Sequence, residues 1–210
     1  MTAEPHSPPS PVASHGKGQV VVFLGPDGAG KSTILAEIER QLSAQGIVHK
    51  SYYFAPGYLK RYRPKGDGSI TTDPHNAPIN SQLKNLARLS LFLFEFHMGM
   101  PRVRRETPLA LFDRHMIDML VDAKRYRMTP TRWWMRLMFR WIPKPDKLVV
   151  ITAPAATIQA RKQEVPFEET VRQLQGYTDL AATYEASLVV ENVAAPEETA
   201  ASVVEFVLNG

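Results

Sequence analysis

The chain has 210 residues, which is long enough for one α/β domain with a sizeable core. It contains no cysteine, which excludes disulfides and thiolate chemistry and is compatible with a cytoplasmic location. The formal net charge of +4 is compatible with a polyanionic substrate, or it simply reflects charged side chains on the solvated surface. The sequence has no nucleic-acid-binding signature.

The chain begins with a polar segment. Residues 1–17 are rich in Pro, Ser, Ala and His and have no hydrophobic periodicity, which predicts a disordered tail. They lack the apolar stretch of a signal peptide. Residues 18–210 then alternate strand and helix patterns without an internal repeat. Such alternation predicts one domain with a parallel sheet and helices on both faces.

A glycine-rich loop between a strand and a helix is the strongest signal. Residues 20–24 are a continuous apolar run, typical of a strand that is buried on both faces. Residues 25–32 fit the pattern G-x-x-x-x-G-K-[ST], and apolar residues at helical spacing follow. The loop and the residue after it are Gly25, Pro26, Asp27, Gly28, Ala29, Gly30, Lys31, Ser32 and Thr33.

This strand–loop–helix context predicts a binding site for a nucleoside triphosphate. Glycines let backbone N–H groups surround phosphates, and the start of the helix adds free amides and the positive end of its dipole. Lys31 can reach the outer phosphates, and the Ser32 hydroxyl can bind Mg²⁺. The alternative is a plain glycine turn, but the presence of all three parts favours the nucleotide site.

The next segments are a strand, a long loop and a long helix. Residues 47–54 read as a strand, and residues 81–105 read as a buried helix that Gly99 and Pro101 should bend or break. The apolar middle of this helix is too short and too charged for a membrane span. The loop between them, residues 55–78, either folds over an anionic substrate or is a mobile solvated loop; its cations are Lys60, Arg61, Arg63 and Lys65.

A second candidate site follows the third strand, residues 109–112. The chain continues there with Asp113, Arg114 and His115. Ligands of open α/β sheets gather at the carboxyl ends of strands, where a carboxylate can hold hydrated Mg²⁺ and an arginine can grip a phosphate. The alternative is a surface ion pair, and the upstream glycine loop favours the functional interpretation.

The rest of the chain continues the alternation. Residues 116–127 and 130–141 read as helices. The second is either a membrane-surface or partner-binding helix, or a lid helix with a solvated arginine face, which we favour; its prominent residues are Arg132, Trp133, Trp134, Arg136, Arg140 and Trp141. A strand at 147–152, a helix ending near 161–164, a helix at 167–186, a strand at 188–191 and a helix at 196–208 complete the pattern.

The glycine loop together with the sequence Phe-Asp-Arg-His at 112–115 resembles the thymidylate kinase family of P-loop kinases. The resemblance extends from about residue 20 to the C-terminus. It implies a three-layer α/β/α P-loop fold with a five-stranded parallel sheet and a short lid. It also implies Mg²⁺-dependent transfer of a phosphate from ATP to a nucleoside monophosphate such as dTMP.

The same resemblance implies roles on the ATP side of the site. Lys31 would steady the transferred phosphoryl group, and Ser32 and Asp113 would lie at the metal. Arg114 would hold the acceptor phosphate. The glycine loop has no arginine, so a lid cation is needed, and Arg161 is the first choice. Residues 192–195 would border the adenine.

On the acceptor side the resemblance is weaker. Asp27 would lie near the acceptor sugar and Phe92 would stack on thymine. An arginine that the family carries on the long helix is replaced by Phe96, and Arg88 is the candidate substitute. The departures from the family pattern cluster on this side, so a changed acceptor is the simplest physical account.

Other functions therefore stay open. The chain also resembles thymidylate-kinase-like proteins associated with surface-polysaccharide biosynthesis, in residues 112–115, 121–127 and 160–164, which implies a sugar or sugar-phosphate acceptor. A third hypothesis is a nucleotide-binding regulatory module. A homodimer and weak membrane-surface contact through residues 130–141 are compatible with the sequence, and a transmembrane segment is not expected.

Overall fold

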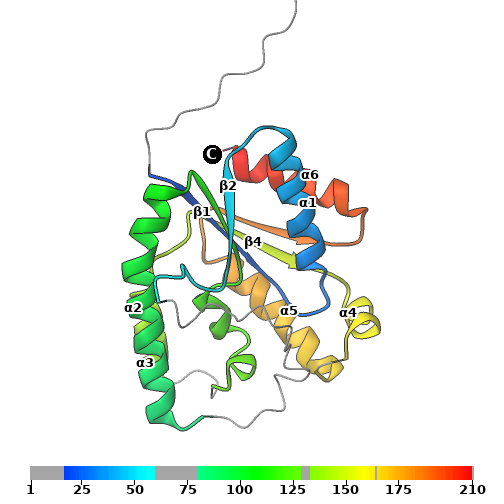
Figure 1. The fold of residues 1–210 in the computed structure, drawn as a ribbon. Coiled ribbons are helices and arrows are strands. Elements are labelled where there is room, and N and C mark those ends of the chain that lie inside the picture. The colour runs from blue at the N-terminus through cyan, green and yellow to red at the C-terminus, as the bar shows by residue number, and fades with distance from the viewer. Residues whose placement is uncertain (1–16, 60–79, 129–132, 164, 210) are drawn as a thin grey trace, which may run out of the picture.

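The computed structural model describes residues 17–59, 80–128, 133–163 and 165–209 (Figure 1). The predicted tail at 1–17, apart from Lys17, therefore lies outside the described residues. So does the predicted loop at 55–78 beyond residue 59, including its four cations.

Five parallel strands form one sheet in the described part of the chain, as the sequence predicts. Their order is β2–β3–β1–β4–β5. The strands are β1 (Gln19–Leu24), β2 (His49–Tyr53), β3 (Leu109–Asp113), β4 (Lys147–Thr152) and β5 (Ser187–Glu191). β1 lies at the centre because its apolar residues are covered on both faces, and it pairs with β3 and β4.

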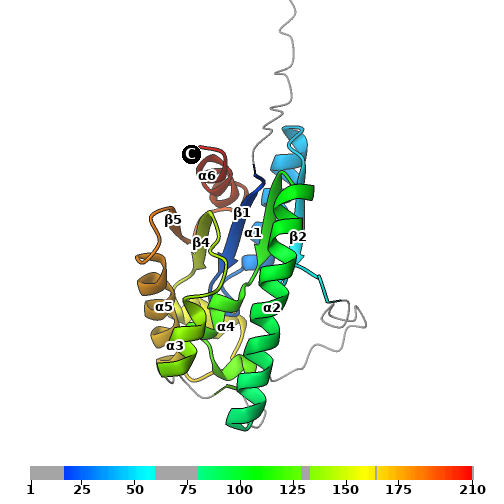
Figure 2. The same ribbon diagram turned by 90° about the vertical axis from the view of Figure 1, so that its left-hand side faces the viewer.

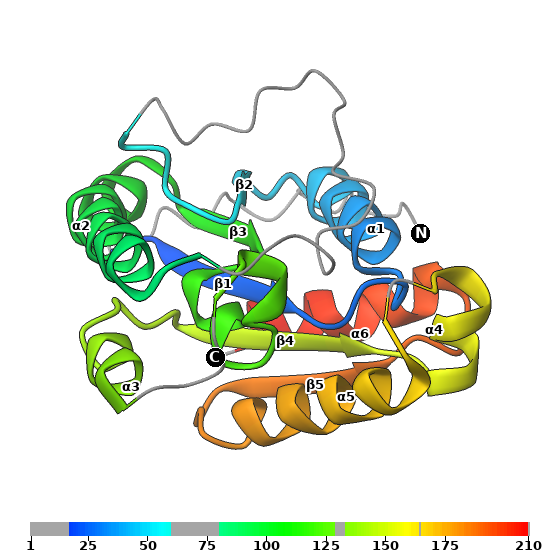
Figure 3. The ribbon, with the colours of Figure 1, turned by 90° about the horizontal axis from the view of Figure 1, so that it is seen from below.

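Helices cover both faces of the sheet and make three layers (Figure 3). Alternate residues of β1 divide the core: Val21 and Phe23 pack with α1, α4 and α6, whereas Val20 and Val22 pack with α2, α3 and α5. The helices are α1 (Lys31–Ala44), α2 (Gln82–Glu106), α3 (Trp133–Phe139), α4 (Ala155–Arg161), α5 (Phe167–Ala181) and α6 (Pro196–Leu208). Figure 2 views the molecule from the side that carries α2 and α3.

Helix α2 is not interrupted at Gly99 and Pro101, where the sequence predicts a bend or a break. Ser81 caps its first turn, and the helix continues through Gly99 and Pro101 to Glu106. Gly99 has a packing role instead, because a Cβ at this position would overlap the Pro56 side chain. The segment after β2 thus packs directly on α2.

A buried carboxylate on α2 holds the same segment. Glu95 is fully buried and accepts hydrogen bonds of 2.6 Å from the backbone N–H groups of both Tyr58 and Leu59. The Glu95 carboxylate therefore satisfies two backbone donors at the start of the predicted long loop.

Two predicted helices are shorter or different in the structure. Residues 116–127 form two short 3₁₀ helices, η2 (Met116–Leu120) and η3 (Lys124–Tyr126), instead of one α-helix. Asp118 in η2 is buried, and its carboxylate accepts a hydrogen bond from the hydroxyl of Tyr126 in η3 at 2.6 Å. Helix α5 ends at Ala181 and not at 186, because the chain turns into β5, and the Thr183 hydroxyl donates to the Leu180 carbonyl at 2.7 Å.

Helix α3 begins at Trp133, and the first residues of its predicted range lie outside the described part. Trp133, Leu137 and Trp141 are exposed. The lid and surface-contact interpretations of this helix remain predictions. Within the described residues, no helix is long and apolar enough to cross a membrane.

A buried lysine joins the start of β4 to the end of α6. Lys147 is 6% exposed, and its Nζ donates to the carbonyl oxygens of Phe206, Val207 and Asn209 at 2.6, 3.0 and 3.0 Å. The last carbonyls of a helix have no partner within the helix, so this ammonium group supplies one.

We therefore expect Lys147→Met to lower the free energy of unfolding by about 1–3 kcal/mol, because it leaves buried carbonyls without a donor. Urea denaturation measures the change. Lys84→Met, at an exposed position of α2, is the matched control and should change stability by less than about 0.5 kcal/mol. Equal stability of the two variants would contradict the role of Lys147.

Candidate active site

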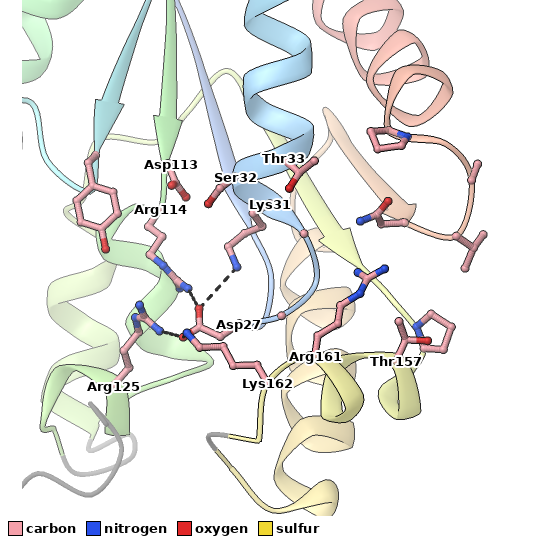
Figure 4. Close-up of a pocket in the computed structure, with 18 residues that line it drawn as sticks. Asp27, Lys31, Ser32, Thr33, Asp113, Arg114, Arg125, Thr157, Arg161 and Lys162 are labelled. Carbon is pink, nitrogen blue, oxygen red and sulfur yellow. Dashed lines mark hydrogen bonds and ion pairs between the residues drawn. The ribbon is translucent and has the colours of Figure 1, made fainter. Parts of the chain in front are cut away.

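A cavity of about 750 Å³ lies at the carboxyl ends of the strands (Figure 4). Its walls come from the glycine loop, the end of β3, η3, α4 and the segment after β5. The volume is in the usual range for small-molecule sites. The structure brings most of the predicted residues to this cavity: Asp27, Gly28, Gly30, Lys31, Ser32, Thr33, Asp113, Arg114 and Arg161.

Close backbone packing sets the shape of the glycine loop. Gly25 has a φ of 144°, and a Cβ there would overlap the carbonyl oxygen of Ile151 in β4. Gly30 has a φ of 89°, and a Cβ there would overlap the side chain of Asn192. The Asn192 amide donates to the Ala29 carbonyl at 2.9 Å, which ties the loop to the segment after β5. Only glycine meets both requirements at positions 25 and 30.

Lys31, at the start of α1, is folded back onto the loop. Its Nζ donates to the carbonyl oxygens of Gly25 and Pro26, both at 2.7 Å. Burial and, after it, the charge of Arg114 lower the pKa of Lys31 to about 7, against the opposing effect of Asp27. A phosphate in the loop would give this ammonium group a stronger partner than two carbonyls.

Ser32 and Asp113 place side-chain oxygens at the cavity, the first from the start of α1 and the second from the end of β3. Ser32 is exposed at the start of α1, and Asp113 ends β3 in register with Phe23 of β1. Asp113 Oδ1 is buried without a hydrogen-bond partner among the described residues. Burial raises the pKa of Asp113, whereas Lys31 and Arg114 lower it. Oδ1 of Asp113 can therefore bind a cation without losing a hydrogen bond to a described residue.

These two oxygens fit Mg²⁺ and not a metal held by many side chains. The described residues contain no group of three or more His, Cys, Asp or Glu side chains that could hold a metal. Mg²⁺ in phosphate-binding sites typically takes one or two protein oxygens and completes its shell with water and phosphate. The donor set of Ser32 and Asp113 matches that pattern.

Arg114 is held in an unusual backbone conformation at the end of β3. Its φ is 70°, in the left-handed region, and its N–H donates to the Phe23 carbonyl at 3.0 Å. This conformation costs a non-glycine residue about 1 kcal/mol or more and is typical of functional sites. It directs the guanidinium between two carboxylates: one Nη pairs with Asp118 at 2.6 Å and the other with Asp27.

Asp118 is the buried anchor of this arginine, and it was not in the predicted site. Its carboxylate is fully buried and accepts hydrogen bonds from the hydroxyls of Tyr126 and Tyr177, both at 2.6 Å. Burial and the Asp118 charge raise the pKa of both tyrosines well above its usual value. The only signal in the sequence is an aspartate inside the apolar run 116–120.

Asp27 lies at the centre of a cluster of cations. Its carboxylate pairs with Arg114 and Arg125, and the Nζ atoms of Lys162 and Lys31 lie 3.8 and 3.9 Å away (Figure 4). Among the described residues that line the cavity, five are cations and two are carboxylates. This excess of positive charge favours a polyanionic ligand.

The lid side of the cavity is formed by α4. Arg161 Nη1 lies above the glycine loop, 3.8 Å from the position that a Cβ of Gly30 would take. The described residues offer Arg161 no salt-bridge partner within 4 Å, so its charge faces the cavity. The segment after β5 borders the same end through residues 192–194, three of the four that the sequence predicts there.

Two predicted acceptor residues do not line this cavity. Phe92 is 2% exposed and packs edge-to-face on Phe54, with ring centroids 5.0 Å apart. Arg88 lies over the Phe92 ring and donates to the Tyr126 carbonyl at 3.0 Å. The cavity wall has other residues that were not in the predicted site, namely Tyr53, Arg125, Thr157 and Lys162. Arg125 arrives there because residues 116–127 fold as 3₁₀ turns.

We expect ATP binding to take up a proton as the pH rises above about 7, because Lys31 is then mostly neutral in the free protein and a bound phosphate raises its pKa. Calorimetry in buffers of different ionisation enthalpy should find uptake near one proton at pH 8 and less at pH 6. Lys31→Met is the control, because this variant lacks the lysine ammonium group while the phosphates of ATP still titrate. The same uptake in both proteins would contradict the prediction.

Asp118→Asn should lower the free energy of unfolding by about 3–5 kcal/mol, since it removes the buried one of the two carboxylates that pair with the Arg114 guanidinium. Urea denaturation at pH 7 tests this. Asp179→Asn, on the exposed side of α5, is the control and should cost less than about 0.5 kcal/mol. A loss of under about 1 kcal/mol for Asp118→Asn would show that Asp118 is not the anchor.

Comparisons with known proteins support the fold. No protein-family model and no curated protein sequence matches the chain. Among solved structures it is similar to deoxyadenosine kinase from M. mycoides with bound dATP, at 17% sequence identity and a TM-score of 0.56. The similarity covers 91% of this chain and 100% of that chain. The five-stranded parallel α/β/α architecture of this chain is therefore the same fold as that of this deoxyadenosine kinase.

Proposed function

We propose that the protein is an ATP- and Mg²⁺-dependent phosphotransferase whose acceptor is a nucleoside monophosphate such as dTMP. The observation that carries the proposal is the cavity itself. In it the phosphate-binding loop with Lys31 and Ser32 faces Asp113 and Arg114 from the neighbouring strand. Phosphoryl transfer needs positioning and charge neutralisation more than covalent chemistry, and this set of groups supplies both.

Each group has a role that follows from its position. Lys31 exchanges its two carbonyl partners for the outer phosphates of ATP. Arg161, above the loop, stabilises the charge that develops on the transferred phosphoryl group. Arg114 holds the acceptor phosphate while its other face stays on Asp118. The attacking atom is an oxygen of the acceptor phosphate, which bonds to the γ-phosphorus of ATP as the bond to the leaving ADP breaks. This oxygen is already ionised, so Asp113 is not needed as a base.

Ser32 and Asp113 would hold Mg²⁺. When it is bound, the ion neutralises charge on the phosphates. The roles of Lys31, Arg114 and Arg161 concern the phosphates directly and do not depend on how the ion is coordinated.

A sugar phosphate is the second candidate acceptor, and one observation favours it. Phe92, which would stack on a thymine ring, is buried in the core away from the cavity. Tyr53 is the aromatic residue that lines the described cavity wall. A site with many cations and few aromatic rings is suited to a phosphorylated sugar as well as to a nucleotide.

An acceptor panel tests both candidates. We expect ADP release from ATP and Mg²⁺ to be stimulated by a monophosphate acceptor, with dTMP, other nucleoside monophosphates, hexose phosphates and the matching unphosphorylated compounds measured side by side. Stimulation by dTMP supports the first acceptor. Stimulation by a hexose phosphate with dTMP inert supports the second. ATP binding without any acceptor-dependent turnover would overturn the kinase proposal and leave a regulatory nucleotide-binding module.

The control for this assay is Lys31→Ala, which should lower acceptor-dependent turnover by several orders of magnitude, since a P-loop lysine acts directly on the phosphates. Lys50→Ala, at an exposed position of β2, should retain the activity of the unmodified protein. Near-normal turnover of Lys31→Ala would show that the measured ADP release comes from another site or another enzyme.

A further inference from the structure

We propose that Arg125 is a second ligand for the acceptor's phosphate, and that the Asp27 carboxylate occupies that phosphate's position until the acceptor binds. The proposal rests on the phosphotransferase function above and adds to it a second ligand for the acceptor phosphate and a carboxylate that this phosphate displaces.

The geometry at Asp27 carries this inference. Arg114 and Arg125 come from different segments, yet their guanidinium groups meet the two different oxygens of one carboxylate. Guanidinium groups pair with carboxylate and with phosphate in the same two-oxygen manner. A site built for one of these anions therefore fits the other. The Asp27 carboxylate marks the place where a phosphate of the acceptor would lie.

Charge is the second argument. Arg114 and Arg125 repel one another, and Lys162 and Lys31 lie within 4 Å of the same carboxylate. Among the described residues, the Asp27 carboxylate lies within 4 Å of all four cations, and Asp118 pairs with Arg114 as well. A phosphate dianion would balance the cluster better than the carboxylate does, so exchange of Asp27 for phosphate is electrostatically favourable.

Both arginines have supports that do not depend on Asp27. Arg114 keeps its 2.6 Å pair with buried Asp118 when its other Nη changes partner. Arg125 donates its backbone N–H to Asp122 Oδ1 at 3.2 Å, which holds its 3₁₀ turn in place. The Asp27 side chain lines the cavity and is 17% exposed, so an incoming anion can reach it. The exchange therefore requires movement of one short side chain and not of the fold.

The experiment uses the full chain saturated with Mg²⁺ and the β,γ-imido analogue of ATP, so that the glycine loop is filled. Inorganic phosphate is then titrated by calorimetry. We expect Arg125→Gln to weaken phosphate binding about tenfold or more, because one charge-assisted contact is lost. Asp27→Asn should tighten it several-fold, since the competing carboxylate is gone. Arg140→Gln, an exposed arginine after α3, should bind phosphate like the unmodified protein.

Two results would overturn the proposal: unchanged phosphate affinity of Arg125→Gln, or weaker phosphate binding by Asp27→Asn. The same titration without the analogue separates the two sources of phosphate. If Arg125→Gln weakens phosphate binding only in the unloaded protein, Arg125 serves the phosphates of ATP and the acceptor proposal fails. If the analogue does not bind at all, the proposed function fails, while the unloaded titration still tests the Arg125–Asp27 site.

Discussion

The buried ion pair between Arg114 and Asp118 is the contact on which the rest of the site depends. An arginine at the end of a central strand is costly to bury, and Asp118 with two tyrosine hydroxyls compensates for that cost. Because Asp118 holds one side of the guanidinium from within the core, the other side is directed into the cavity. Asp118 lies in the first of two 3₁₀ turns, and Arg125 lies in the second and lines the cavity.

Positive charge is concentrated in this cavity, and few carboxylates among the residues that line it balance this charge. Lys31 donates to two backbone carbonyls, and the Asp27 carboxylate pairs with two arginines. Burial of Lys31 and the neighbouring Arg114 charge lower the pKa of Lys31. This excess of positive charge favours a polyanionic ligand.

Much of the fold could be predicted from the chain alone. The apolar runs, the glycine loop and the alternation of patterns predict the parallel sheet and its three layers, because these are local signals. The sequence pattern is a poorer guide where contacts between residues far apart in the chain determine the structure. Gly99 and Pro101 suggested a bend or break in α2, but the helix is not interrupted there, and Gly99 allows close packing on Pro56. Phe92, which the resemblance places against thymine, packs in the core against Phe54, and its contact with an acceptor stays a prediction.

The sequence by itself determined the class of fold, the phosphate-binding loop, and the placement of Asp113 and Arg114 at the end of a neighbouring strand. Each of these features depends on a short stretch of consecutive residues, so the sequence pattern alone indicates it. Only the tertiary structure decided which cations share Asp27 and which carboxylate anchors Arg114. Those pairs join residues far apart in the chain, and the local pattern around Asp118 and Arg125 resembles that of an ordinary helix until the packing of α5 and the glycine loop is known.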